Sequence, residues 1–147
     1  MQTARAKPSA LVKPTLETRF HIDYGWWEKN TEEHLRTYLL SHLPIEQRER
    51  LAQAADDEVI DYVDPETGEV SRLDALQVAL QQAARDPNYI NPHIAMVDAI
   101  FRTLLANGNR PLTPVELAEA IGQDAGKILR TLSGGRVFKG IRPTSGD

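Results

Sequence analysis

The chain has 147 residues, 41% of them hydrophobic and 26% charged, which is the composition of one soluble domain or of two small ones. The absence of cysteine excludes disulfides, thiolate zinc sites, iron–sulfur clusters and cysteine nucleophiles. No stretch approaches the roughly 20 apolar residues of a membrane span, and the N-terminus lacks an apolar secretory core. We therefore expect a cytoplasmic protein with no membrane partner.

The formal net charge of −4 is divided unevenly along the chain. Residues 21–90 carry fifteen acids against six cations, whereas residues 91–147 carry seven cations against five acids. Within the latter, residues 125–143 hold five cations and no carboxylate. This local field suits an anionic partner, although the same charges could also form a solvated face.

The N-terminal part begins with residues 1–18, which combine two prolines and scattered cations with no apolar periodicity. This pattern predicts a disordered basic arm. Apolar and polar residues then alternate over residues 19–24. We expect a half-buried strand with Phe20, Ile22 and Tyr24 on its buried face.

Two helices are predicted next. Asn30 and Glu33 have the spacing of a helix capping box, and apolar residues at helical intervals follow as far as Pro44. Pro44 can occupy the first turn of another helix that continues through Ile45, Leu51 and Ala55.

The following segment has the pattern of a β-hairpin. Residues 59–63 and 69–71 are the expected strands, and Gly68 can adopt the positive φ needed where the second strand begins. A helix over residues 72–85 should bury Leu73, Leu76 and Leu80.

The prolines at positions 87 and 92 mark the clearest boundary in the chain, because each disfavours a helical conformation in the residue before it. We expect an α+β region over residues 19–88, a second module over residues 91–143 and a tail at residues 144–147.

In the second module, Asn91 and Pro92 predict the start of a helix that ends at Asn107-Gly108. The run Thr113-Pro114-Val115-Glu116 combines a threonine N-cap, a proline in the first turn and a glutamate that can reach back to the cap. This helix should end at Gly122.

A third helix should begin at Asp124, which we interpret as an N-cap, and direct Ala125, Ile128, Leu129 and Leu132 inward. The spacing of Ala118, Gly122 and Ile128 resembles the helix-turn-helix family, where two helices cross at a small residue, a turn glycine and an apolar residue. Two residues depart from the pattern: Gln123 stands where the family usually has an apolar side chain, and Gly126 weakens the helix by about 1 kcal/mol relative to alanine.

The module ends in a flexible Ser133-Gly134-Gly135 turn, followed by alternating cations over residues 136–143, which look like the wing of a winged helix protein. The expected fold class is therefore α+β and mainly helical, with an N-terminal strand, a β-hairpin and a C-terminal winged helix-turn-helix.

The resemblance implies that the helix over residues 124–132 is a recognition helix. Arg130 could then reach a guanine edge in the major groove, Lys127 could contact a phosphate, and cations of the wing could contact the backbone or the minor groove. The residues expected to contact DNA are Gln123, Lys127, Arg130, Thr131, Arg136, Lys139 and Arg142.

Other constellations favour no chemistry. His34 and His42, eight positions apart on one helix, would lie about 12 Å apart along its axis, too far for one metal ion. We interpret them as surface or cap residues, and His21 and Asp23 as the exposed face of the first strand. The acids between Asp56 and Asp64 lack the spacing of an EF-hand. We expect no metal, no cofactor and no enzymatic activity.

The adjacent Trp26 and Trp27 leave two interpretations open. Neighbouring side chains of an extended segment face opposite ways, so one tryptophan could anchor a partner. Alternatively, both could be buried around a bend at Gly25.

These features favour a small bacterial DNA-binding protein, a transcriptional regulator that contacts double-stranded DNA through its C-terminal winged helix. The alternative is a protein-interaction or assembly module that uses the winged helix as a scaffold without binding DNA. Its acidic N-terminal region would then engage a basic protein. A single recognition helix reads only a few base pairs, which favours a homodimer.

Overall fold

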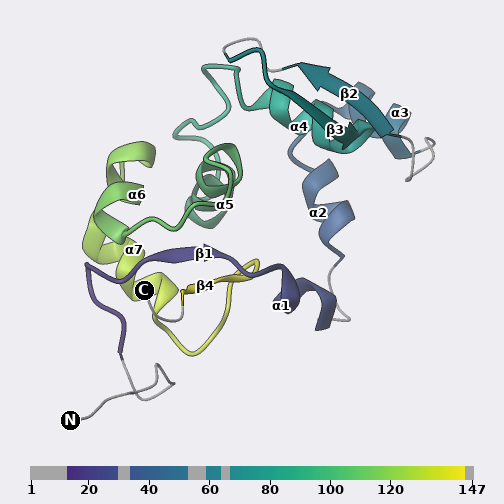
Figure 1. Ribbon diagram of the computed structural model, residues 1–147. Helices are drawn as coiled ribbons and strands as arrows, with labels where there is room; N and C mark the ends of the chain where they lie inside the picture. Colours follow the sequence, from purple (N-terminus) through teal and green to yellow (C-terminus); the bar gives the residue numbers. More distant parts are fainter. Residues whose placement is uncertain (1–12, 30–33, 53–58, 64–66, 145–147) are drawn as a thin grey trace. The chain divides into compact units, whose positions relative to one another are not determined.

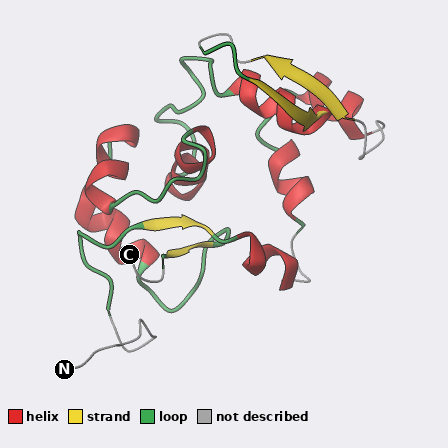
Figure 2. Ribbon diagram, viewed as in Figure 1, coloured by secondary structure: helices red, strands yellow, loops and turns green. Residues whose placement is uncertain are grey.

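The computed structural model describes residues 13–29, 34–52, 59–63 and 67–144, and the chain folds as two compact units (Figures 1 and 2). Unit 1 combines residues 1–29 with residues 90–147, and unit 2 comprises residues 30–89. Both units contain helices and a small antiparallel sheet, so the protein is of mixed α+β class.

Unit 1 is built around the short strand β1 (Phe20–Ile22). The strand pairs antiparallel with β4 (Ile141–Pro143), and the two lie side by side in Figure 1. On its other edge, Phe20 forms a bridge with Leu112, in which each residue donates its N–H to the carbonyl of the other. Both edges of β1 are thus occupied by the C-terminal part of the chain.

The side chain of Asn109 extends this second edge of β1. Its Oδ1 accepts a hydrogen bond from the N–H of Ile22 at 2.8 Å, and its Nδ2 donates to the carbonyl of Ile22 at 2.9 Å. The amide therefore bonds both backbone groups of Ile22 as a neighbouring strand would. Asn109 has a φ of +60°, a conformation that asparagine tolerates better than most residues.

The core of unit 1 joins β1 to the helices. Phe20 and Ile22 are buried on one face of the strand, as their alternation with His21 predicted. Tyr24 is not: it begins helix α1 (Tyr24–Lys29) and is 40% exposed. The chain turns at Asp23, whose Oδ1 accepts a hydrogen bond from the N–H of Gly25 at 3.0 Å.

Three further helices complete unit 1: α5 (Met96–Ala106), α6 (Pro114–Ile121) and α7 (Ala125–Leu132). Each contributes at least one completely buried side chain, and burial of such a side chain typically stabilises a fold by about 1.5–3 kcal/mol. The fully buried apolar residues from these helices are Ile100, Phe101, Leu104, Pro114, Leu117 and Ile128.

The start of α5 differs from the prediction. The helix begins at Met96 rather than Pro92, because the side chain of Asn91 accepts a hydrogen bond from the N–H of His93 at 2.8 Å and holds this stretch in a turn. Its end agrees with the prediction, since Gly108 has a φ of +73°.

The ends of α6 are confirmed. The N–H of Glu116 donates to Thr113 Oγ1 at 3.2 Å, and the N–H of Thr113 donates to Glu116 Oε1 at 2.8 Å, which is a complete capping box. Gly122 ends the helix with a φ of +72°. Asp124 then caps α7, because its Oδ2 accepts a hydrogen bond from the N–H of Lys127 at 2.9 Å.

The structure does not confirm the predicted wing. Of residues 136–143, only Ile141–Pro143 form a strand, and this strand pairs with β1 rather than with a strand close to it in sequence. A tight turn leads into β4, with a φ of +53° at Lys139 and +74° at Gly140. An apolar strand from the N-terminal segment, with Ile22 opposite Ile141, takes the place beside β4.

Unit 2 contains the helices α2 (Leu35–Leu40), α3 (Ile45–Ala52) and α4 (Ala75–Ala83) and the strands β2 (Val59–Val63) and β3 (Val70–Asp74). The hairpin is confirmed, with Val63 opposite Val70 and a φ of +76° at Gly68.

One boundary in unit 2 differs from the prediction. Helix α4 begins at Ala75 rather than at residue 72, because β3 runs to Asp74, which forms a capping box with Gln77. Leu76 and Leu80 are buried as predicted, and in α3 Leu51 is buried while Ile45 is 60% exposed. The predicted capping box at Asn30 and Glu33 lies outside the described residues.

The chain leaves unit 1 after Lys29 and returns to it at Ile90. Residues 19–29, which the sequence analysis grouped with the hairpin region, therefore belong with the C-terminal helices. Of the predicted basic arm, residues 1–12 lie outside the described part, and residues 13–18 contain a turn in which the N–H of Thr18 donates to the carbonyl of Thr15 at 3.0 Å. Thr144, assigned to the tail, donates its N–H to the carbonyl of Arg19 at 2.8 Å and so lengthens the β1–β4 ladder.

The Asn109 clamp on β1 leads to a first prediction. Asn109→Gly keeps the positive φ accessible but removes both hydrogen bonds to Ile22, and should lower the free energy of unfolding of unit 1 by about 1–2 kcal/mol. Urea unfolding followed by tryptophan fluorescence measures this, because both tryptophans of the chain lie in α1. Asn107→Gly is the matched control, since Asn107 bonds the nearby Arg110. Equal losses in the two variants would contradict the role of Asn109.

Gly140 leads to a second prediction. A Cβ at this position would lie 2.8 Å from Trp27 Nε1 and 3.0 Å from Trp27 Cδ1, and the φ of +74° is itself strained for a residue with a side chain. Gly140→Ala should therefore cost about 2 kcal/mol or more in the same urea experiment.

Gly135→Ala is the control for this substitution, because a Cβ at Gly135 meets nothing within 4 Å and the residue has no positive φ. Its unfolding midpoint should stay within about 0.5 kcal/mol of the wild-type value. A similarly small effect at Gly140 would mean that Trp27 does not pack against this turn.

Candidate nucleic-acid interface

Helix α7 separates apolar from charged side chains. Ile128 and Leu132 are buried within unit 1, whereas Lys127 and Arg130 are exposed. Gln123, just before the helix, is also exposed. Packing against unit 1 thus holds the helix by one side and leaves its cations in solvent.

The cations of α7 have no internal charge partner among the described residues. Neither the Lys127 ammonium nor the Arg130 guanidinium forms a hydrogen bond or an ion pair with any residue of the described ranges. The N–H of Lys127 is the group that Asp124 binds, which leaves the ammonium available. Both charges can therefore interact with an external anion without first breaking a contact.

Gly126 leaves space for the side chains of Asp124 and Arg130. A Cβ at this position would lie 3.1 Å from the Oδ2 of Asp124 and 3.5 Å from an Nη1 of Arg130. Glycine in a helix costs about 1 kcal/mol relative to alanine, but here it allows the capping carboxylate and the guanidinium to lie close to the helix backbone.

The loop after α7 adds further cations. The guanidinium carbon of Arg136 lies 5.2 Å from the centre of the Phe138 ring, within the range of a cation–π contact. Arg136 is exposed, while Lys139 and Thr131 are half-buried. We call residues 125–143, which comprise α7, this loop and β4, the basic segment.

Trp27 fixes the end of this loop. Its indole Nε1–H donates to the carbonyl of Lys139 at 3.1 Å, and its ring lies 6.3 Å from that of Phe101 in an edge-to-face arrangement. With only 4% of its surface exposed, Trp27 is a core residue, as in the interpretation that places the tryptophans in the core around Gly25. Trp26 is half-buried against Trp27, at 5.0 Å between ring centres, and for this residue the prediction of a partner anchor stays untested.

The charge of Arg142 is engaged, in contrast to the charges of Lys127 and Arg130. Its Nη1 lies 3.3 Å from the Oδ2 of Asp23, with the two side chains 49% and 33% exposed. Asp23 was predicted only to be exposed, and no role was predicted for Asn109 or Gly140. Contacts between residues more than 80 positions apart give these three their roles, and no local pattern signals such contacts.

The two units carry opposite charge. Unit 1 has twelve cations and eight carboxylates, a formal charge of +4, whereas unit 2 has five cations and thirteen carboxylates, a formal charge of −8. The net acidity of the chain thus comes from unit 2, and the unit that contains the basic segment is itself cationic.

Other parts of the described chain offer weaker sites. No group of three or more histidine, aspartate or glutamate side chains within the described ranges could hold a metal ion.

His34 is exposed, but His42 is 7% exposed with its ring 4.6 Å from that of Tyr38, so the expectation of a surface or cap role is wrong for His42. Partial burial raises the pKa of the Tyr24 phenol above its usual value.

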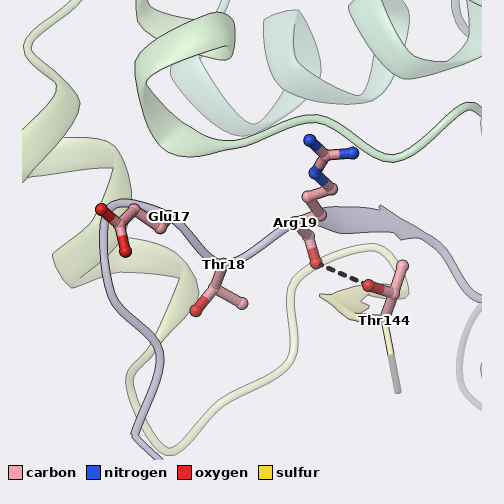
Figure 3. A pocket seen from close by; sticks show the side chains of 4 residues that line it. All are labelled: Glu17, Thr18, Arg19 and Thr144. Atoms are coloured by element: carbon pink, nitrogen blue, oxygen red, sulfur yellow. Dashed lines mark hydrogen bonds between the residues drawn. The ribbon is translucent and has the colours of Figure 1, made fainter. Parts of the chain in front are cut away.

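A shallow pocket is lined by Glu17, Thr18, Arg19 and Thr144 (Figure 3). The Oγ1 of Thr144 donates to the carbonyl of Arg19 at 3.3 Å, which closes the end of the β1–β4 ladder. The carboxylate of Glu17 and the guanidinium of Arg19 point away from one another in this view, so the pocket has no convergent polar groups.

Comparisons with known proteins add no identification: no family model, no curated protein and no solved structure matches the chain. Within the part of the chain that the structure describes, no helix has the length and apolar character needed to cross a bilayer. A function for this protein is therefore inferred from the chemistry of the basic segment.

Proposed function

We propose that this protein binds double-stranded DNA through α7 and the loop that follows it, and that it acts as a small transcriptional regulator. The observation that carries the proposal is the amphipathic character of α7. Its buried apolar side fixes the helix, and its exposed Lys127 and Arg130 have no carboxylate partner within the described residues.

The order of elements in unit 1 supports a winged-helix-like arrangement. Helix α5, the bridging residue Leu112, helices α6 and α7, and strand β4 follow one another as in that class. We propose that β1 supplies the strand that would otherwise come from a C-terminal wing hairpin. The wing would then be formed by the β1–β4 pair and residues 133–140.

The dimensions of α7 suit the major groove. An α-helix with its side chains is about 10–12 Å in diameter, which matches the roughly 12 Å width of that groove, and the eight residues of α7 extend about 12 Å along it. With α7 lying in the major groove, Arg130 would face base edges, where arginine commonly binds guanine, and Lys127 and Arg136 would contact phosphates. The contacts to phosphate would provide affinity, and the contact of Arg130 would provide sequence preference.

The charge of unit 2 favours a second candidate function. With a formal charge of −8, it would attract a basic protein. In that case the chain would be an interaction module, and the basic segment would serve solubility or a protein contact.

Charge reversal at α7 tests the first function. Lys127→Glu combined with Arg130→Glu should abolish duplex binding measured by fluorescence anisotropy at low salt, because two phosphate or base contacts are replaced by repulsion. Both side chains lie on the exposed side of α7, so the urea unfolding midpoint should change little. In the wild type, log affinity should fall linearly with log salt concentration.

The matched control reverses two cations elsewhere, Lys29→Glu and Arg50→Glu. Both are exposed and lie outside the basic segment, and the pair changes the net charge of the protein by the same amount. This control should retain most of the binding. Loss of affinity in both double variants alike, or no binding of the wild type at low salt, would show the proposal to be wrong and favour the interaction module.

A further inference from the structure

Arg142 is the cation of the basic segment that is already engaged by a carboxylate, and this arrangement suggests how DNA binding is limited. Arg142 lies opposite His21 in the β1–β4 ladder, and its guanidinium reaches along β1 to Asp23. A phosphate that binds Arg142 therefore competes with the carboxylate of Asp23 for the guanidinium Nη1.

Hydrogen bonds with the backbone fix the position of Asp23 and orient its carboxylate. The N–H of Asp23 donates to the carbonyl of Gly140 at 2.8 Å, and the carbonyl of Asp23 accepts a hydrogen bond from the N–H of Trp26 at 3.1 Å. Its Oδ1 accepts a further hydrogen bond from the N–H of Gly25 at 3.0 Å, which leaves Oδ2 directed at Arg142. Little side-chain entropy is lost when the ion pair forms, because Asp23 is already ordered.

The pair is also weak enough to be exchanged. Both side chains are partly exposed, and ion pairs in such positions contribute little and are screened by salt. A DNA phosphate carries a full negative charge and can displace the carboxylate where the duplex comes close to β4. The contact at Arg142 is thus conditional, unlike the contacts expected at Lys127 and Arg130.

We infer that Asp23 is an internal competitor of DNA phosphate at Arg142, which lowers the affinity of the free protein for duplex DNA. This inference rests on the proposed function. It assigns a regulatory role to an acidic residue of the N-terminal segment, 119 positions away from the cation that it opposes.

Asp23→Asn tests the inference in the full-length chain. The asparagine Oδ1 can still accept the hydrogen bond from Gly25, so the turn before α1 should persist, as the urea unfolding midpoint would show. Duplex binding should become about two- to fivefold tighter at low salt, the range expected for release of an exposed ion pair. The slope of log affinity against log salt should stay close to the wild-type slope, because Arg142 contacts the phosphate in both proteins and only the competition by Asp23 is removed.

Glu28→Gln is the matched control for net charge. Glu28 lies in α1, is exposed, and forms no side-chain hydrogen bond or ion pair with any residue that the structure describes. It should tighten binding less than Asp23→Asn and leave the salt slope unchanged. If both variants tightened binding equally, the effect would be one of total charge and the inference would be overturned.

Arg142→Gln provides a second measurement that does not depend on the fold of the Asp23 variant. If phosphate displaces Asp23, this substitution should lower the salt slope by about 0.9, and adding Asp23→Asn to it should change nothing further. An unchanged slope, or full tightening by Asp23→Asn in the Arg142→Gln background, would overturn the inference. If the wild type binds duplex DNA and Asp23→Asn binds it with the same affinity, only the inference is refuted. If the wild type binds no duplex DNA, the proposed function is refuted as well.

Discussion

The insertion of β1 between Leu112 and β4 is the interaction on which unit 1 depends. A strand of three residues would be unstable alone. Here both edges of β1 form backbone hydrogen bonds with the C-terminal part of the chain. Phe20 and Ile22 contribute to the same core as Phe101 and Ile128, so pairing and apolar burial support one another. The position of the basic segment follows from this arrangement, because Trp27 and Asp23, just after β1, fix the turn that leads into β4.

Local rules were sufficient for most of the helices. The Thr113–Glu116 capping box, the glycine that ends α6 and the cap at Asp124 each depend on residues within four positions of one another, and all three were predicted correctly. The hairpin of unit 2 was predicted for the same reason, since its strands are joined by a short turn. The error at Pro92 was also local: an asparagine before a proline can begin either a helix or a turn.

The partner of β4 could not be predicted in this way. A stretch of alternating cations near the end of a winged helix suggests a hairpin with its neighbour in sequence, and nothing in residues 133–143 indicates that the pairing strand lies more than 100 residues earlier. The alternation of Phe20, His21 and Ile22 showed that this segment was a strand, but not which strand it would join. Periodicity, which is a local pattern, predicted that the cations of α7 are exposed. It could not predict the ion pair between Arg142 and Asp23, because these residues lie far apart in the sequence.

The distance in sequence between β1 and β4 has a consequence for how the protein is made. At a synthesis rate of about 5–20 residues per second, the 119 residues between Asp23 and Arg142 take roughly 6–24 seconds to appear. During this time Phe20, Ile22 and Trp27 have no complete core to enter, and all of unit 2 emerges before that core can close. Until residues 141–143 are made, nascent chains of this protein therefore carry an unpaired apolar segment at residues 20–27. We expect that segment to be a binding site for chaperones and the part of the chain most exposed to aggregation.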